Sequence, residues 1–364
     1  MPDLFIELLQ VSLGARDCLS RFPTSKEWKY LFEESKRQAV SGIAFEGVQK
    51  LPETQRPPKT LLFEWIGLSE QVRLQNIVVD KHTREIWNKL KEDGLETAIL
   101  KGQGIATLYG ELAPYRQSGD IDIWVKGGYQ RICDYVQRTH PTDDVAYHRF
   151  HYDYFEDTEV ELHHRPTLMR NLLDDRKLAK WYNSFGADRF VYLEDKGFSV
   201  PSLEFNKIFI LTHIYRHFLF EGIGLRQVMD YFFVLRAQND GSCQKDDVRR
   251  TLHELKLTRF AKAMMWILHT QLGLEEKYLI CGMNEKEGRF VLNEIEQTGN
   301  FGYTDSRYTY KHFFKLRRQI AHGAHLLLHY PSEVIWTPIW LVYHKVWKWR
   351  RKREIHRMWK SAKE

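Results

Sequence analysis

Two aspartates, Asp120 and Asp122, stand two residues apart in the segment RQSGDIDIWV. The β-rich alternation at residues 121–125 predicts a strand, on which residues two apart point to the same face. Two adjacent carboxylates repel each other, so such a pair is tolerated when a divalent cation lies between them. The pair therefore predicts a site for Mg²⁺ or Mn²⁺. The alternative is a turn acid followed by a solvated strand face.

A third carboxylate from a neighbouring strand would complete a two-metal site. The later segment TEVELHH alternates in polarity, with Val160 and Leu162 as its apolar residues. Glu161 and His163 therefore share a polar face opposite the core. We choose Glu161 as the third acid, because it would bind a second metal ion and help to deprotonate an acceptor hydroxyl. Glu159 is the alternative on the same face.

A glycine-containing turn follows a short apolar segment at residues 97–100. Its glycines would let backbone N–H groups approach a triphosphate, and a helix expected at residues 104–109 would present its N-terminus to the phosphates. Lys101 would add a point charge and Arg116 a fork-like contact, unless they are an ordinary strand end and an ordinary loop arginine. The predicted substrate-binding residues are Lys101, Gly102, Gln103, Arg116, Ser118, Gly119 and His163.

Taken in their order along the chain, these motifs resemble those of the DNA polymerase β-type nucleotidyltransferase superfamily. They resemble more closely those of a bacterial family of uncharacterised nucleotidyltransferases. The resemblance implies that Mg²⁺ is held by the three acids, which are also the catalytic residues, and that the match runs from about residue 75 to residue 350. The matching residues are Leu100-Lys101-Gly102, Arg116, Gly119-Asp120-Ile121-Asp122, Glu161-Leu162-His163 and Leu225-Arg226 to Asp230.

The elements that must position these residues form an α+β protein with an α/β core. A helix ends at Asp93-Gly94, and strands at residues 97–100 and 121–125, a helix at 129–139 and a hairpin of strands 145–155 and 158–163 predict a mixed sheet. After residue 201 the sequence is mostly helical, with helices expected at 203–221, 227–238 and 245–272, and from about 310 to the end with interruptions at Pro331 and Pro338. The expected domains are an N-terminal helical segment (1–75), a polymerase β-like nucleotidyltransferase core (76–200) and a C-terminal helical domain with a basic aromatic tail (201–364).

Other candidate residues have simpler explanations. His213 and His217 stand four apart on an expected helix, a spacing that can bind zinc, but their neighbours are apolar and no acidic third ligand follows. A hydrogen-bonded helix histidine is favoured. Asp230 lies near Arg226 at helical spacing, which favours a structural ion pair over a role in a nucleotide cleft.

The formal net charge of +6 is concentrated in the tail. Nine Lys or Arg residues against two Glu residues lie between His344 and Glu364, so the rest of the chain carries about −1. A nucleic-acid acceptor is therefore not favoured. Three uses of the tail stay open, namely a solvated basic helix with a packed tryptophan face, a weak contact with an anionic membrane, and a nucleic-acid contact. The four scattered cysteines indicate a reducing cytoplasm.

These observations predict an enzyme that transfers an NMP from an NTP, with ATP as the expected donor, to the hydroxyl of an unknown small-molecule or protein acceptor, releasing pyrophosphate. The alternative is a non-catalytic nucleotide-binding or partner-binding module on the same fold. For the enzyme, we expect Asn at position 120 or 122 to abolish transfer. Because repulsion would be relieved, we expect these substitutions to leave the fold intact or slightly stabilised.

Overall fold

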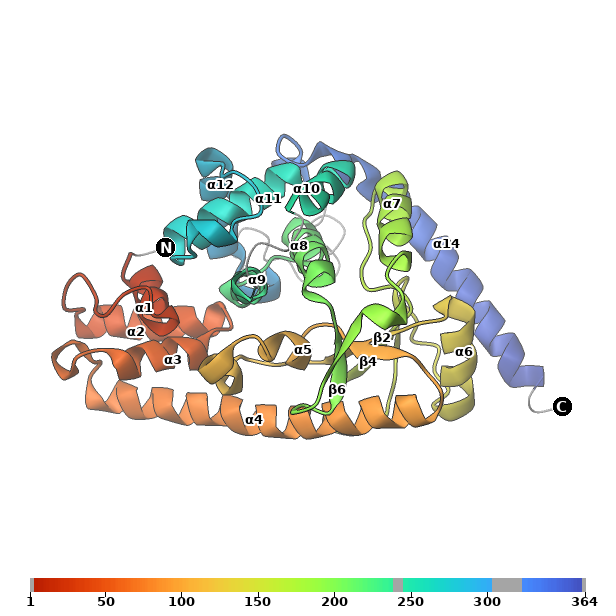
Figure 1. The fold of residues 1–364 in the computed structure, drawn as a ribbon, viewed down its shortest axis with the longest axis horizontal. Helices are drawn as coiled ribbons and strands as arrows, with labels where there is room; N and C mark the ends of the chain where they lie inside the picture. The colour runs from red at the N-terminus through yellow and green to blue at the C-terminus, as the bar shows by residue number, and fades with distance from the viewer. Residues whose placement is uncertain (1–2, 238–244, 303–322, 362–364) are drawn as a thin grey trace. The chain divides into compact units, whose positions relative to one another are not determined.

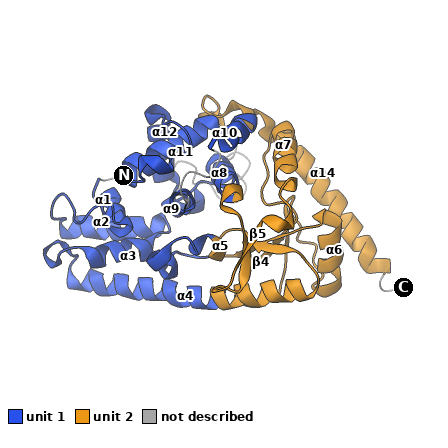
Figure 2. Cartoon of the chain, in the orientation of Figure 1, with its two compact units in different colours: residues 1–78, 105–118, 206–322 blue, residues 79–104, 119–205, 323–364 orange. Residues whose placement is uncertain are grey.

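The computed structural model describes residues 3–237, 245–302 and 323–361 (Figure 1). The chain forms two compact units (Figure 2): unit 1 contains residues 1–78, 105–118 and 206–322, and unit 2 contains residues 79–104, 119–205 and 323–364. This division differs from the three consecutive domains expected from the sequence. Residues 105–118 join unit 1 because they pack on its helices; the Asn76 side chain, for example, donates to the Arg116 carbonyl at 2.8 Å. The tail belongs to unit 2 with the sheet.

Unit 1 is helical, as the sequence predicts for its parts. The helix expected at residues 245–272 is divided, because the chain turns at Lys256, which adopts a φ of 59°. A turn of this hand usually carries glycine, so the sequence gives little sign of it. The unit contains α1 (Asp3–Leu13), α2 (Ser25–Arg37), α3 (Ser41–Lys50), the first part of α4 (Lys59–Glu92), most of α8 (Leu203–Phe220), α9 (Leu225–Arg236), α10 (Lys245–Glu254), α11 (Thr258–Trp266) and α12 (Glu285–Thr298).

Unit 2 is built around a four-stranded mixed sheet, which confirms the predicted α+β class. The strand order is β1-β2-β4-β3, in which β2 pairs antiparallel with β1 and parallel with β4. The strands are β1 (Thr97–Ile99), β2 (Ile121–Val125), β3 (Arg149–His151) and β4 (Val160–His163). The predicted hairpin is present, but its first strand is only three residues long, because residues 145–150 make a tight turn of their own.

The alternation of polarity gives the two faces of this sheet different roles. Ile121, Ile123 and Leu162 point into a core shared with α4 and α6 (Gly128–Thr139). The intervening residues point to the other face, where Asp122 stands beside Glu161 in the register of the parallel pair. A one-residue shift of either strand would bury the carboxylates in that core, so burial of the isoleucines fixes the polar face.

Three elements of unit 2 are not predicted by the sequence pattern. They are α7 (Leu172–Asn183) and a separate two-stranded sheet of β5 (Phe190–Leu193) and β6 (Phe198–Pro201). The core-facing side of this hairpin comes from Phe198 and Val200. The segment has too few apolar residues at regular spacing to distinguish these elements from a loop.

The tail forms one helix, α14 (Pro331–Ser361), which contradicts the expected interruption at Pro338. Pro331 occupies the first helical position, where its missing N–H costs nothing. Pro338 is exposed, so its ring meets solvent rather than a packed neighbour. The expected helix from about residue 310 lies, up to residue 322, outside the described residues. Within the described ranges, no helix is long and apolar enough to cross a membrane.

The cysteines that the structure describes are free thiols. Cys133 is buried and Cys18 is exposed, with Cys281 intermediate. Cys243 lies outside the described residues.

The start of α14 is held by a buried carboxyl, that of Glu333. It accepts hydrogen bonds from the backbone N–H groups of Arg170, at 2.7 Å, and Asn171, at 3.2 Å. Burial, aided by the nearby Asp174 carboxylate, raises the pKa of Glu333 to about 7, against the opposing effect of these N–H groups and of the Arg170 cation. Glu333 therefore binds its proton more tightly in the folded chain, and this contribution to stability is lost as the pH rises through the folded pKa.

Replacing Glu333 by Gln removes this titration. We expect the unfolding free energy of the wild type to fall relative to that of Glu333→Gln by about 1.4 kcal/mol for each pH unit between the unfolded and folded pKa values. Urea denaturation at pH 5, 6, 7 and 8 measures the difference. Glu354→Gln is the matched control, because Glu354 is exposed and pairs with Arg351 on the same helix. Parallel pH curves for the wild type and Glu333→Gln would contradict the assignment.

Candidate active site

Asp122 is almost fully enclosed. It lies in the middle of β2 with 2% of its surface exposed. Its Oδ1 atom is 2.8 Å from the Lys101 Nζ and 2.8 Å from the His163 Nε2. Burial alone would raise the pKa of the Asp122 carboxyl, but the two cations outweigh burial and hold that pKa well below its usual range. Asp122 is therefore an ionised carboxylate with two basic partners.

Glu161 joins the same group from the neighbouring strand. Its Oε2 atom is 3.2 Å from the His163 Nε2 and 3.0 Å from the Arg149 Nε on β3. One ligand atom from each of Asp122, Glu161 and His163 can be chosen so that all three lie within 4.8 Å of one another. Two carboxylates and an imidazole at this separation can hold one divalent cation. The structure thus places Glu161, rather than the exposed Glu159, beside Asp122.

The acids of this group are already neutralised by the protein. Lys101, His163 and Arg149 supply three basic groups to the two buried carboxylates. Burial lowers the pKa of the His163 imidazole, but its hydrogen bonds to Asp122 and Glu161 raise it more, so the net shift is upward. Burial also lowers the pKa of the Lys101 ammonium, but the charges of Asp122, Asp120 and Glu161 raise it more, so the net shift is again upward. The burial of Asp122 and Glu161 therefore does not by itself require a metal ion, and metal binding stays a prediction.

Asp120 lies immediately before β2 and is half-buried. Its charge contributes to the raised pKa of Lys101, together with the charges of Asp122 and Glu161. The metal-binding group found in the described part of the chain does not include Asp120. Its role as a metal ligand stays a prediction.

The Lys101–Gly104 turn is shaped by the end of β1. Gly102 has a φ of 49°, and a Cβ on Gly104 would lie 2.6 Å from the Ile99 carbonyl oxygen, so both positions favour glycine for reasons of backbone geometry. The Gln103 side chain donates a hydrogen bond to Asp80 on α4.

The helix that follows this turn, α5 (Gln103–Ala106), has only four residues. The expected helix at residues 104–109 is therefore wrong in length. The dipole of so short a helix is small, so a phosphate contact here would depend on the backbone N–H groups of the turn and stays a prediction.

Arg116 forms a buried ion pair within unit 1. Its Nε and Nη2 atoms bind the two oxygens of Asp230 at 2.7 and 2.8 Å, and the Tyr109 hydroxyl donates to the same carboxylate at 2.6 Å. Asp230 was expected to pair with Arg226, but Arg226 donates to the Gln117 carbonyl instead. This fork-on-carboxylate geometry occupies the guanidinium edge that was predicted to bind phosphate.

Ser118 and Gly119 continue the chain from Arg116 to the acids. Ser118 is half-buried and Gly119 is exposed. A Cβ at Gly119 would meet open space, and Gly119 does not have a positive φ, so nothing in the local packing requires glycine there. The predicted close approach of a ligand at Gly119 stays a prediction.

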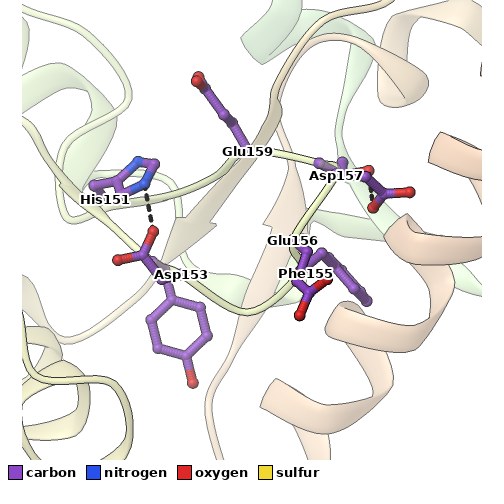
Figure 3. A pocket seen from close by; sticks show the side chains of 8 residues that line it. His151, Asp153, Phe155, Glu156, Asp157 and Glu159 are labelled. Carbon is purple, nitrogen blue, oxygen red and sulfur yellow. Dashed lines mark hydrogen bonds and ion pairs between the residues drawn. The ribbon is translucent and has the colours of Figure 1, made fainter.

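A hollow of about 380 Å³ lies in the connection between β3 and β4 (Figure 3). His151 and Asp153 pair at 2.7 Å on one side of it, and the Glu159 side chain points away from this pair. The lining residues are His151, Tyr152, Asp153, Phe155, Glu156, Asp157, Thr158 and Glu159. Asp122, Glu161 and His163 are not among them, so this hollow is separate from the metal-binding group.

The histidines on α8 do not form a metal site with a third ligand in the described residues. The His217 Nδ1 atom is 2.6 Å from the Glu221 carboxylate, one helical turn away. This confirms the interpretation of His217 as a hydrogen-bonded helix histidine.

Arg149 is a site residue that the sequence did not identify. It stands opposite His163 in the register of β3 and β4, on the polar face of the sheet. The alternation Arg149-Phe150-His151 places Arg149 on that face. Alternation alone did not identify Arg149 as a site residue, because it does not show which residue of β4 lies opposite.

The fold and the site define an α+β protein with a basic and acidic cluster on one face of a mixed sheet. The chain belongs to the family described as "Uncharacterised nucleotidyltransferase", which matches residues 24–273. The match begins earlier and ends earlier than the sequence suggested: it includes α2 and α3 and excludes α12 and α14.

Among solved structures, the chain is similar to an antigenic nucleotidyltransferase-like protein from Paracoccidioides brasiliensis. The two share 15% identity with a TM-score of 0.32, over 54% of this chain and 92% of the other. No curated protein matches the sequence.

Replacing Asp122 by Asn removes the ion-pair partner of Lys101 and one of the two carboxylates that bind His163. We expect a loss of about 3 kcal/mol in unfolding free energy, because breaking a buried pair exposes the cost of the remaining charge. This reverses the expectation that relief of repulsion would leave the fold intact or slightly stabilised. Urea denaturation measures the loss, and the Asp122→Asn/Lys101→Met double variant should recover part of it. Wild-type stability of Asp122→Asn would refute the pairing.

Proposed function

We propose that this chain transfers a nucleoside monophosphate from an NTP to an acceptor hydroxyl. The observation that carries the proposal is the group of Asp122, Glu161 and His163, whose ligand atoms lie within 4.8 Å on the polar face of the sheet. Membership of a nucleotidyltransferase family supports it, because the match covers all three residues. The acceptor is a small molecule or a protein, and ATP is the expected donor.

The donor set fits a divalent cation. Two carboxylates are ligands typical of Mg²⁺ and Mn²⁺, and the imidazole of His163 is accepted more readily by Mn²⁺ than by Mg²⁺. Asp122, Glu161 and the neutral imidazole of His163 would hold the ion, with Asp120 at the edge of the site, so His163 would release its proton when the ion binds. When bound, such an ion supplies positive charge that offsets the charge of a triphosphate and of the oxygens at the reacting phosphorus.

The residues of the chain would divide the remaining work. Lys101 is held on Asp122 by one ion pair and has 19% of its side chain exposed, so its ammonium can exchange that carboxylate for a phosphate oxygen. In the reaction a bond forms between the acceptor oxygen and the α-phosphorus, the bond from that phosphorus to the bridging oxygen breaks, and pyrophosphate leaves. The hydroxyl proton passes to Glu161, the acid that Arg149 and His163 orient.

A second candidate is a non-catalytic module that binds a nucleotide or a partner on the same fold. One observation favours it: Lys101, Arg149 and His163 neutralise the buried acids without a metal ion. The cluster can therefore persist as a structural network. The two candidates differ in their need for a metal ion.

A thermal-shift panel tests the proposal and names the donor. We expect one NTP, in the presence of Mg²⁺ or Mn²⁺, to raise the melting temperature, since a ligand at a hundredfold over its Kd stabilises by about 2.7 kcal/mol. The panel uses ATP, GTP, CTP and UTP, each with metal and with EDTA. The shift should disappear in Glu161→Gln and persist in Glu159→Gln, the matched control immediately before the same strand.

Two outcomes would contradict the proposal. A nucleotide shift of equal size in EDTA indicates a binding module, because a catalytic site of this class needs its metal. Equal shifts in Glu161→Gln and Glu159→Gln would show that the nucleotide binds elsewhere. A donor identified in this panel then allows a search for the acceptor by release of pyrophosphate.

Because Lys101 occupies Asp122, we expect Mn²⁺ alone to bind weakly and a non-hydrolysable NTP analogue to strengthen its binding. Lys101→Met should raise the affinity for Mn²⁺ alone about tenfold, which corresponds to about 1.4 kcal/mol. Electron paramagnetic resonance of free Mn²⁺ measures this without any activity. Lys126→Met is the control, since the Lys126 ammonium stacks on Trp124 and does not pair with Asp122. Unchanged Mn²⁺ affinity in Lys101→Met would show that Lys101 does not compete with the ion.

A further inference from the structure

One face of the helix α14 carries apolar side chains that do not pack against the rest of unit 2. Its inward face is buried: Trp340 and Ile355 are enclosed, and the Trp359 Nε1 donates to the Gln137 side chain at 2.7 Å. On the opposite side, five large apolar side chains recur at alternating spacings of four and three residues and are 44–67% exposed. They are Ile335, Ile339, Val342, Val346 and Trp349.

This apolar stripe is continuous with a basic surface toward the end of the helix. At 100° per residue, four exposed cations lie within about 60° of the centre of the stripe. They are Arg350, Arg353, Arg357 and Lys360. The Arg353 guanidinium also lies 4.7 Å from the centre of the Trp349 ring.

The charges on the two sides of α14 are used differently. Lys352 and His356, at the edge of the stripe, both bind Asp143 of the same unit, at 3.0 and 3.2 Å. The acidic residues that the structure describes on this helix are turned away from the stripe, since Glu333 is buried and Glu354 pairs with Arg351. The outward face is therefore apolar along its first half and positively charged along its second.

We propose that this outward face of α14 binds the surface of an anionic lipid bilayer. Aliphatic side chains and a tryptophan would enter the boundary between headgroups and acyl chains, and the four cations would lie against the lipid phosphates. The helix would lie parallel to the surface, because the stripe runs along its length. The inference is independent of nucleotidyl transfer, and α14 lies outside the residues that match the family.

Two other occupants explain less of this face. A second copy of the chain could cover the apolar stripe, but five side chains are far fewer than the 20–30 residues per partner of a stable interface, and the cations would gain no counter-charge. A single-stranded nucleic acid would match the cations, but it binds by stacking on aromatic rings, and the stripe contains one aromatic residue and four aliphatic ones. An anionic bilayer complements both halves.

Vesicle flotation tests the proposal with the full chain. The probes are vesicles of phosphatidylcholine alone and of phosphatidylcholine with 30% phosphatidylserine. We expect binding to the anionic vesicles and not to the neutral ones, weakened by 0.5 M NaCl. Val342→Glu/Val346→Glu should reduce the partition coefficient at least about tenfold, and Arg350→Gln/Arg353→Gln should do the same. The control is Leu74→Glu/Ile77→Glu on α4, two residues that are also exposed and apolar.

The substituted side chains are exposed, so the variants should fold, which circular dichroism and the melting temperature check. Failure of the wild type to float with anionic vesicles would overturn the proposal. So would wild-type flotation of the Val342→Glu/Val346→Glu variant, or equal loss in the α4 control. A dimer in sedimentation that this variant makes monomeric would identify a second copy as the occupant. Tighter binding to single-stranded RNA than to vesicles would identify a nucleic acid instead.

Discussion

The buried carboxylate of Asp122 is the constraint on which the site depends. Placing this charge in the middle of β2 is costly unless basic groups reach it, and both Lys101 and His163 do so at 2.8 Å. Lys101 reaches it from the end of β1 and His163 from the end of β4, so these ion pairs tie three strands together on one face. The same arrangement of these three strands therefore determines both the register of the sheet and the contacts of the polar cluster.

This arrangement changes how the site should be understood. In the proposed nucleotidyl transfer, the acids that pair with Lys101, His163 and Arg149 would exchange protein cations for an external one. The triphosphate would help this exchange, because it offers Lys101 another partner. Metal and nucleotide binding would then be coupled through the same lysine.

Local patterns predicted the central part of the fold and failed where the information is not local. The strand at Ile121–Val125 and the polar face of Glu161 and His163 follow from alternation, because burial of one face fixes the other. The contribution of Arg149 depends on which residues lie opposite each other in β3 and β4, and alternation does not give register. The pairing of Arg116 with Asp230 joins residues 114 positions apart, so sequence spacing could not reveal it.

For the tail, composition suggested several possible partners, but the sequence did not show which residues face outward. Nine cations among tryptophans allowed a solvated helix, a membrane contact and a nucleic-acid contact. The structure separates the residues by face. Trp340, Trp359 and Ile355 turn toward the rest of unit 2, and Trp349 turns outward with the aliphatic residues. A helix that is apolar on all sides is usually buried on all sides. The first half of α14 is apolar in this way yet exposed along one side, so that side is expected to bind a partner. The tryptophan content alone did not identify which side this is.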